Sequence, residues 1–188
     1  MKRIQESQKR WLQLFRTNVA YWVAAGICAP FLSAYYKSIG LTSSQIGVLF
    51  AASPICAICI QPLWAWVSDH SGKRKTILAA LAVCTAAASL LYYAGKSFAV
   101  CFFATMVLSM FSSALLPLCD AIVIDRAAAY QCNFATIRIG GTLGFALIVF
   151  LAGFLLERHP SLQFLLSCGA YLVFALVVLR IPMDGGQE

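Results

Sequence analysis

Long apolar stretches separated by short polar segments run through almost the whole chain. Six intervals contain no Asp, Glu, Lys or Arg, and they are 17–36, 38–68, 76–95, 97–119, 139–156 and 159–179. A helix needs about 20 apolar residues to cross roughly 30 Å of hydrocarbon. Each interval is long enough to predict one membrane-spanning helix.

Turn residues at the start of the long second interval place a helix boundary inside it. Gly40 ends the connection, and Thr42-Ser43-Ser44-Gln45 has the pattern of a capping box, in which the first and last side chains bond each other's backbone. We therefore expect an all-α integral membrane bundle with an N-terminal segment at 1–16 and the start of a linker at 181–188. The six helices of its 17–180 domain are expected at about 17–37, 43–68, 76–95, 97–120, 134–156 and 160–180.

The composition excludes an ordinary soluble domain. Hydrophobic residues make up 61% of the 188 residues and charged residues 11%, against about 45–50% and 25% in soluble domains. The mean hydropathy is +0.82. So few charged side chains cannot coat a globular core, and the lipid bilayer is the solvent that this chain fits.

The basic residues indicate an orientation in the membrane. With the N-terminus inside, eleven Lys and Arg fall on the inner face and only Lys37, Lys96 and Arg158 on the outer face. This bias predicts a multi-pass protein of the cell membrane with both termini cytoplasmic. It explains the net charge of +7 better than a nucleic-acid partner does. The pairs Tyr35-Tyr36 and Tyr92-Tyr93 are expected near the outer interface.

Cysteines and histidines do not form a recognisable catalytic or metal site. Most of the eight cysteines lie inside predicted spans, where a thiol behaves as a small apolar group. Cys56 and Cys59 form a C-x-x-C in mid-helix with no second pair and no nearby His, which favours packing over redox chemistry or metal binding. His70 and His159 lie at span ends on opposite faces. We therefore expect no enzyme, no cofactor and no metal.

The segment after the second predicted helix is a candidate gate. Asp69 lies at a helix C-terminus, where the negative end of the helix dipole is unfavourable for it. Gly72 permits a tight reversal that would bring Lys73 and Arg74 within reach of the carboxylate. A solvated cytoplasmic loop explains the same residues at least as well.

Asp120 and Arg138 are the ionisable residues nearest to the predicted hydrocarbon region. Such groups usually face a cavity or each other, but both could equally extend to the inner interface. The spacing leaves the two alternatives open. Gly140 and Gly144 form a G-x-x-x-G, which together with Gly141 predicts close helix packing beside Arg138.

These motifs together resemble the major facilitator superfamily. Asp69-x-x-Gly72-Lys73-Arg74 is similar to the signature loop between its second and third helices, and Phe134-x-x-x-Arg138-x-x-Gly141-x-x-Gly144-Phe145 is similar to its fifth helix. Asp120 lies 18 residues before Arg138, as the helix-4 carboxylate does in the lactose permease group. The resemblance covers roughly residues 15–182 and implies the N-terminal half of a twelve-helix carrier.

The resemblance also implies roles for these residues. Asp69, Gly72, Lys73 and Arg74 would form a cytoplasmic gate. Asp120, Arg138 and Phe145 would bind the substrate, with Phe145 at the position of a sugar-stacking tryptophan.

Several positions depart from the lactose permease pattern. Ala65 and Lys73 replace a glycine and an arginine of the loop motif, Asp120 is shorter than the sugar-binding glutamate, and Phe145 is a weaker stacking surface than Trp. The helix-5 pattern resembles the nucleoside and phenylpropionate permease-like branch at least as well.

Three functional hypotheses follow. The leading one is transport of a small organic solute by alternating access, coupled to protons, together with a second six-helix half that this chain lacks. The others are a half-transporter that pairs with a second copy of itself and a truncated membrane fragment without transport activity.

Overall fold

The computed structural model describes residues 2–181, with side chains from residue 8 onward. The described residues are helical with no strand, which confirms the all-α prediction. The helices are α1 (Lys2–Cys28), η1 (Ala29–Phe31), α2 (Leu32–Ser38), α3 (Ser43–Ser71), α4 (Arg74–Ser89), η2 (Leu90–Tyr93), α5 (Phe98–Ser112), α6 (Leu115–Ala129), α7 (Phe134–Leu156) and α8 (Leu162–Leu179).

These helices combine into six spans that are long and apolar enough to cross a membrane, counted over the described residues. They are Gln8–Ser38, Ser43–Ser71, Arg74–Tyr93, Phe98–Ala129, Phe134–Leu156 and Leu162–Leu179. The segment 2–16 continues the first span as one helix. Of the segment 181–188, only Ile181 lies within the described residues.

Two of the spans are interrupted at prolines. Pro30 lies in the 3-10 segment η1 that joins α1 to α2. Pro117 lies in the first turn of α6, and its missing N–H cannot bond the carbonyl of Ser113, where the helix breaks. The fourth span is therefore two helices, α5 and α6.

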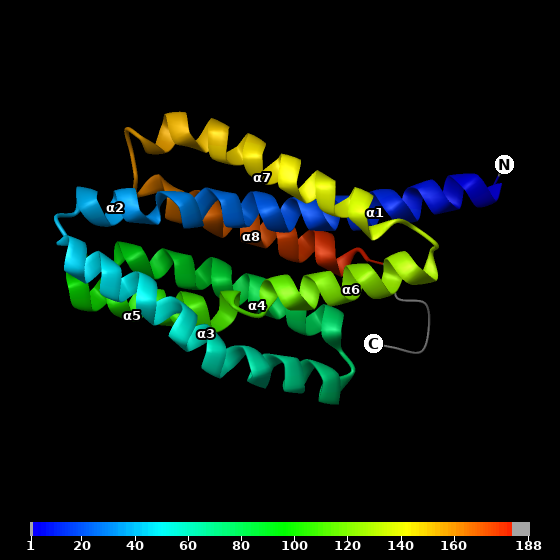
Figure 1. Ribbon diagram of the computed structural model, residues 1–188, viewed down its shortest axis with the longest axis horizontal. Coiled ribbons are helices and arrows are strands. Elements are labelled where there is room, and N and C mark those ends of the chain that lie inside the picture. Colours follow the sequence, from blue (N-terminus) through cyan, green and yellow to red (C-terminus); the bar gives the residue numbers. More distant parts are fainter. Residues whose placement is uncertain (1, 182–188) are drawn as a thin grey trace.

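The third helix diverges from the bundle over its second half. Figure 1 shows α3 curving away from its neighbours towards its C-terminal end, and Pro54 and Pro62 lie inside it. Its start has the predicted capping box, in which Thr42 N–H donates to Gln45 Oε1 at 2.9 Å and Gln45 N–H donates to Thr42 Oγ1 at 3.3 Å.

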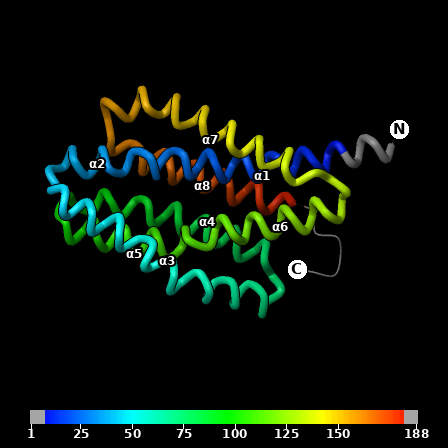
Figure 2. The backbone as a smooth tube through the Cα atoms, viewed as in Figure 1, coloured from blue at the N-terminus to red at the C-terminus, as the bar shows by residue number. Residues whose placement is uncertain are grey.

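The bundle is organised around α1, which packs most extensively against α7 and α8, while α4 packs on α8 and α3 on α5. In Figures 1 and 2, α7 and α3 lie at opposite margins. Gln13 of α1 donates to the carbonyl of Arg180 at 3.1 Å, so the first and last described spans meet at one end. Lys75 Nζ donates there to the carbonyl of Ile181 at 3.1 Å. We call this the basic end and the opposite one the far end.

At the far end, three of the four tyrosines expected near an interface pack inside the bundle, while Tyr93 is 51% exposed. Tyr35, Tyr36 and Tyr92, expected near a membrane interface, are buried. The ring of Tyr92 stacks on Phe164 of α8 with centroids 4.2 Å apart. Hydroxyl groups of Tyr36, Tyr92 and Thr105 lie within 2.8–3.1 Å of one another. Their polar ends therefore find partners within the protein, which a sequence pattern of aromatic pairs does not reveal.

Candidate functional site

Asp120 and Arg138 form an ion pair between α6 and α7. Arg138 Nη1 donates to Asp120 Oδ2 at 2.5 Å, and the two side chains are 37% and 23% exposed. Of the two alternatives that the sequence left open, the structure shows pairing. Each charge compensates the other at a partly buried position, where an isolated ion would be costly.

Local sequence signals place both charges. The break before Leu115 starts α6 anew, so that Asp120 lies in its second turn. Asn133 caps α7 by accepting a hydrogen bond from the Ala135 N–H at 2.9 Å, and Arg138 follows in the second turn. The short connection between Ala129 and Phe134 holds the two helices together as neighbours.

An aromatic wall lies beside the Asp120–Arg138 pair. The guanidinium carbon of Arg138 lies 5.0 Å from the ring centroid of Trp22 on α1, within the range of a cation–π contact. Phe145 of α7 meets the same ring edge-on, with centroids 5.8 Å apart. The ring of Tyr21 also meets the Trp22 ring edge-on, with centroids 5.4 Å apart. Arg138 and Phe145 therefore both contact Trp22, and Asp120 joins them through its ion pair with Arg138.

Several polar atoms around this pair lack a partner among the described residues. They are both side-chain polar atoms of Asn18, Nε1 of Trp22 and Oδ1 of Asp120. Asn18 is fully buried. Buried polar groups in native proteins nearly always have a hydrogen-bond partner. The hydrogen-bonding capacity of these atoms is therefore unused among the described residues.

Three glycines let α7 approach α1 at this place. A Cβ added at Gly140 would collide with the ring of Phe15, and one at Gly141 with Asn18 Oδ1 and Trp22 Cδ1. At Gly144 it would lie 3.1 Å from Val19 Cγ1. All three face α1, and Gly141 lies directly against the residues with unpartnered polar atoms.

The predicted gate residues lie at the basic end. Arg74 donates to Asp69 Oδ1 at 2.8 Å and to Asp125 Oδ2 at 3.0 Å, so one guanidinium joins α3, α4 and α6. Gly72 caps α3 in the left-handed conformation, with φ of 67°. Lys73 is exposed and starts the next helix. The reversal at Gly72 brings Arg74 to the carboxylate of Asp69.

The sequence analysis did not identify three residues that the structure places around the Asp120–Arg138 pair and around Arg74. Trp22 and Asn18 lie on α1, far along the chain from α6 and α7, and only the packing of α1 against the glycines joins them. Asp125 lies five residues after Asp120 on α6, roughly 7.5 Å along the helix axis. The available signals were an amide and an aromatic residue in the first two turns of the predicted 17–37 helix.

Comparisons with known proteins place the chain among transporters. The MFS_1 like family model matches residues 14–185. The chain is 29% identical over 170 residues to the uncharacterized transporter YwbF of Bacillus subtilis (strain 168), covering 89% of this chain and 42% of that protein. It is 30% identical over 161 residues to the maltose permease of Geobacillus stearothermophilus, covering 85% and 41%.

A solved structure has the same fold. The crystal structure of the nucleoside transporter NupG matches with a TM-score of 0.83 at 19% sequence identity, covering 93% of this chain and 44% of that chain. The chain therefore spans less than half the length of each of these three proteins.

Proposed function

The chain belongs to the MFS_1 like family, and from that premise we propose that it is the N-terminal six-helix half of a major facilitator carrier. In this proposal the carrier moves a small organic solute across the membrane by alternating access, coupled to protons. The solute binds between two six-helix halves that rock about it. The residues that carry protons are assigned to the second half.

The observation that carries the proposal is the Asp120–Arg138 pair with its unpartnered neighbours. A carboxylate and a guanidinium side by side supply acceptors and donors for the hydroxyl or amide groups of a solute. Trp22 and Phe145 add apolar ring surface, on which a sugar or base ring can stack. The names of the maltose permease and of the nucleoside transporter are consistent with solutes of this kind.

The residues at the basic end would act as the gate. Arg74 joins Asp69 and Asp125, and all three side chains are 40% exposed or more. Exposed ion pairs are weak, so this contact can break and re-form during a transport cycle. Because α6 carries both Asp120 and Asp125, a solute that moves α6 would also disturb the gate.

Exposed apolar faces on the two marginal helices support a partner for this half. On α3 and α7 the large exposed apolar side chains include Ile55, Ile58, Leu63, Trp66, Ile139, Leu143, Leu147, Phe150 and Phe154. In the proposed carrier, lipid and the second half cover these faces. That second half is a different six-helix segment or, alternatively, a second copy of this chain.

The proposed location is the cell membrane, with both ends of the chain in the cytoplasm. The distribution of Lys and Arg supports this orientation. The basic end of the bundle, with Arg74 and Lys75, then faces the cytoplasm.

Uptake measurements test the proposed site. With a second half supplied, we expect Arg138→Gln to reduce uptake of radiolabelled maltose, raffinose or uridine, whichever the carrier accepts. The loss of charged hydrogen bonds worth ~1.5–3 kcal/mol corresponds to about 10- to 150-fold in affinity. The control, Arg158→Gln, removes the same charge from the α7–α8 connection and should leave uptake unchanged. Equal effects of both substitutions would contradict the site.

A further inference from the structure

An apolar groove runs between α1 and α8, which lie side by side in Figures 1 and 2. Its volume is about 330 Å³. Apart from Arg16, the side chains that line it are apolar, and they are Phe15, Val19, Ala20, Val23, Ala170 and Val173. Val173 is 56% exposed, so the groove opens to the outside of the bundle.

The groove lies along two membrane-spanning segments. Both of its walls belong to spans that are long and apolar enough to cross a bilayer. From Arg16 to Val23 it extends roughly 10 Å along the axis of α1, which is about two thirds of one ~15 Å leaflet of the hydrocarbon region. A groove of this kind faces lipid chains and not water.

A cation of α1 stands at one end of the groove. Arg16, Ala20 and Val23 are four and three residues apart, so they share one face of the helix. Gln13 lies one turn before Arg16 on that face and donates to the carbonyl of Arg180. Arg16 is therefore at the basic end of the groove, and the apolar residues lead from it towards the middle of the span.

A second cation continues the other wall towards the same end. Ala170, Val173 and Arg180 are three and seven residues apart, which places them on one face of α8. The side chains of Arg16 and Arg180 are both exposed. Among the described residues, neither guanidinium has a hydrogen bond or an ion pair. Both are available to an anion from outside the protein.

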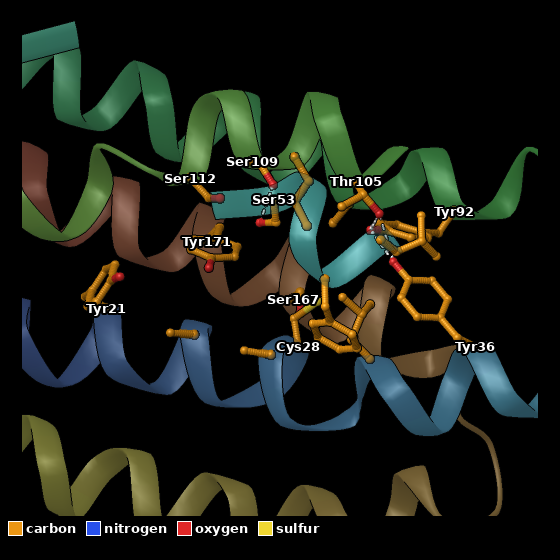
Figure 3. A pocket seen from close by; sticks show the side chains of 17 residues that line it. Tyr21, Cys28, Tyr36, Ser53, Tyr92, Thr105, Ser109, Ser112, Ser167 and Tyr171 are labelled. Carbon is orange, nitrogen blue, oxygen red and sulfur yellow. Dashed lines mark hydrogen bonds between the residues drawn. The ribbon is translucent and has the colours of Figure 1, made fainter. Parts of the chain in front are cut away.

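The cavity inside the bundle does not offer this combination. It has a volume of about 280 Å³, and Figure 3 shows its hydroxyl groups together with the thiol of Cys28. Within the described part of the chain, no Asp, Glu, Lys, Arg or His lines it. A phosphate group there would have no counter-ion, and its desolvation would be costly. The groove between α1 and α8 instead joins an apolar surface to cations at one end.

We propose that this groove binds one anionic phospholipid, with an acyl chain along the groove and the phosphate group at Arg16 and Arg180. Guanidinium groups bind phosphate oxygens through parallel hydrogen bonds. Basic residues next to a membrane span attract anionic lipids, which are concentrated in the cytoplasmic leaflet. The proposal rests on the proposed function only for the leaflet that supplies the lipid. Lipid binding itself requires neither a solute nor a second half, so binding and transport can fail separately.

Native mass spectrometry of the full chain in detergent tests the proposal. The probes are dioleoyl phosphatidylglycerol, phosphatidylcholine with the same chains, and glycerol 1-phosphate. We expect one retained phosphatidylglycerol per chain, with a Kd about 5- to 30-fold lower than that of phosphatidylcholine, because each cation at an anionic lipid contributes about fivefold. Glycerol 1-phosphate, which has the phosphate without the chains, should not be retained.

Two pairs of variants test the two parts of the site. Arg16→Gln should weaken phosphatidylglycerol binding by about fivefold, while Lys73→Gln, which removes an exposed cation from the α3–α4 connection, should leave it unchanged. Val173→Trp fills the groove and should remove the retained lipid. Val83→Trp is its control, because Val83 is a 47% exposed valine on α4.

Several results would overturn the proposal. Equal affinities for the two phospholipids, or equal losses in Arg16→Gln and Lys73→Gln, would show a general attraction to surface charge. Retention of glycerol 1-phosphate would identify a site for free phosphate. A lipid that stays bound in Val173→Trp would lie outside the groove. If Arg16→Gln does not fold, Arg180→Gln takes its place with the same expected loss.

Discussion

Asp120 and Arg138 hold each other in place at the centre of a small group of unsatisfied polar atoms. The ion pair uses one carboxylate oxygen, while the other is buried and unpartnered. The side-chain amide of Asn18 and the indole N–H of Trp22 are also buried without a hydrogen-bond partner among the described residues. A site that is complete without a ligand would satisfy these groups internally, so their state is consistent with a place that a solute fills.

The indole N–H of Trp22 offers a test that keeps the aromatic wall. In Trp22→Phe a ring remains beside Arg138, but the unpartnered donor is gone. We expect the KM for the transported solute to rise about 2- to 12-fold, which corresponds to one hydrogen bond of ~0.5–1.5 kcal/mol. Trp66→Phe is the control, because Trp66 is 65% exposed on α3 and stacks on His70. An unchanged KM in Trp22→Phe would show that the N–H does not contact the solute.

Gly141 sets how closely α1 and α7 approach. In Gly141→Ala the new methyl group would collide with Asn18 and Trp22. We expect a loss of ~1–3 kcal/mol in the free energy of unfolding from overpacking, and loss of uptake because Trp22 is displaced. The measurements are the midpoint of thermal unfolding in detergent and solute uptake. Gly169→Ala is the control, because a Cβ at Gly169 meets nothing within 4 Å, and that variant should be as stable as the parent or more so. Matching behaviour of the two variants would show that the close approach has no role.

At the scale of elements, the sequence predicted six spans and missed the break that divides the fourth span into α5 and α6. Charge-free length fixes how many helices can cross a bilayer, and the Thr42–Gln45 capping box is local, so both were readable from the sequence. The break between α5 and α6 depends on Pro117, which a charge count ignores. Contacts between distant elements, such as Tyr92 on Phe164 or Trp22 beside Arg138, need the packed bundle.

The α6 helix connects the two candidate functional groups. It carries Asp120 of the proposed substrate pair and Asp125 of the proposed gate. The two carboxylates pair with different helices. Asp120 pairs with Arg138 of α7, and Asp125 pairs with Arg74 of α4. A small rotation of α6 would therefore strain both contacts together, which would link the two sites in the proposed alternating access.

Opening the gate should change access to the bundle interior. In Asp69→Asn the carboxylate that Arg74 binds from α3 becomes a neutral amide, so the contact between α3 and α4 weakens. We expect the rate at which a thiol reagent labels Cys28, which lines a cavity between α1, α3, α5 and α8, to change by about two- to fivefold, the effect of ~0.5–1 kcal/mol. Membrane insertion should be unaffected. Peptide mass spectrometry reports the labelling at Cys28.

The control for this change is Glu157→Gln, which removes a carboxylate at the far end and should leave Cys28 labelling as it is. An identical labelling rate in Asp69→Asn and in the parent would show that the segment Asp69–Lys75 is a solvated connection without a gating role.

At the scale of the whole molecule, the chain is one six-helix bundle, and each of the three similar proteins is more than twice as long. The apolar stripe on α7 and the weakly packed α3 are what a bundle shows when lipid or another bundle covers its margins. Family membership accounts for the fold.

Solute uptake in three configurations tests the central claim, which is that this bundle is one half of a carrier whose Asp120–Arg138 pair binds the solute. The measurement compares the chain alone, the chain with a second six-helix half, and that combination with Arg138→Ala. We predict uptake when two halves are present and its loss with Arg138→Ala. Uptake by the chain alone would indicate pairing of two copies. Uptake that survives Arg138→Ala would contradict the site, and no uptake in any configuration would contradict the transport function itself.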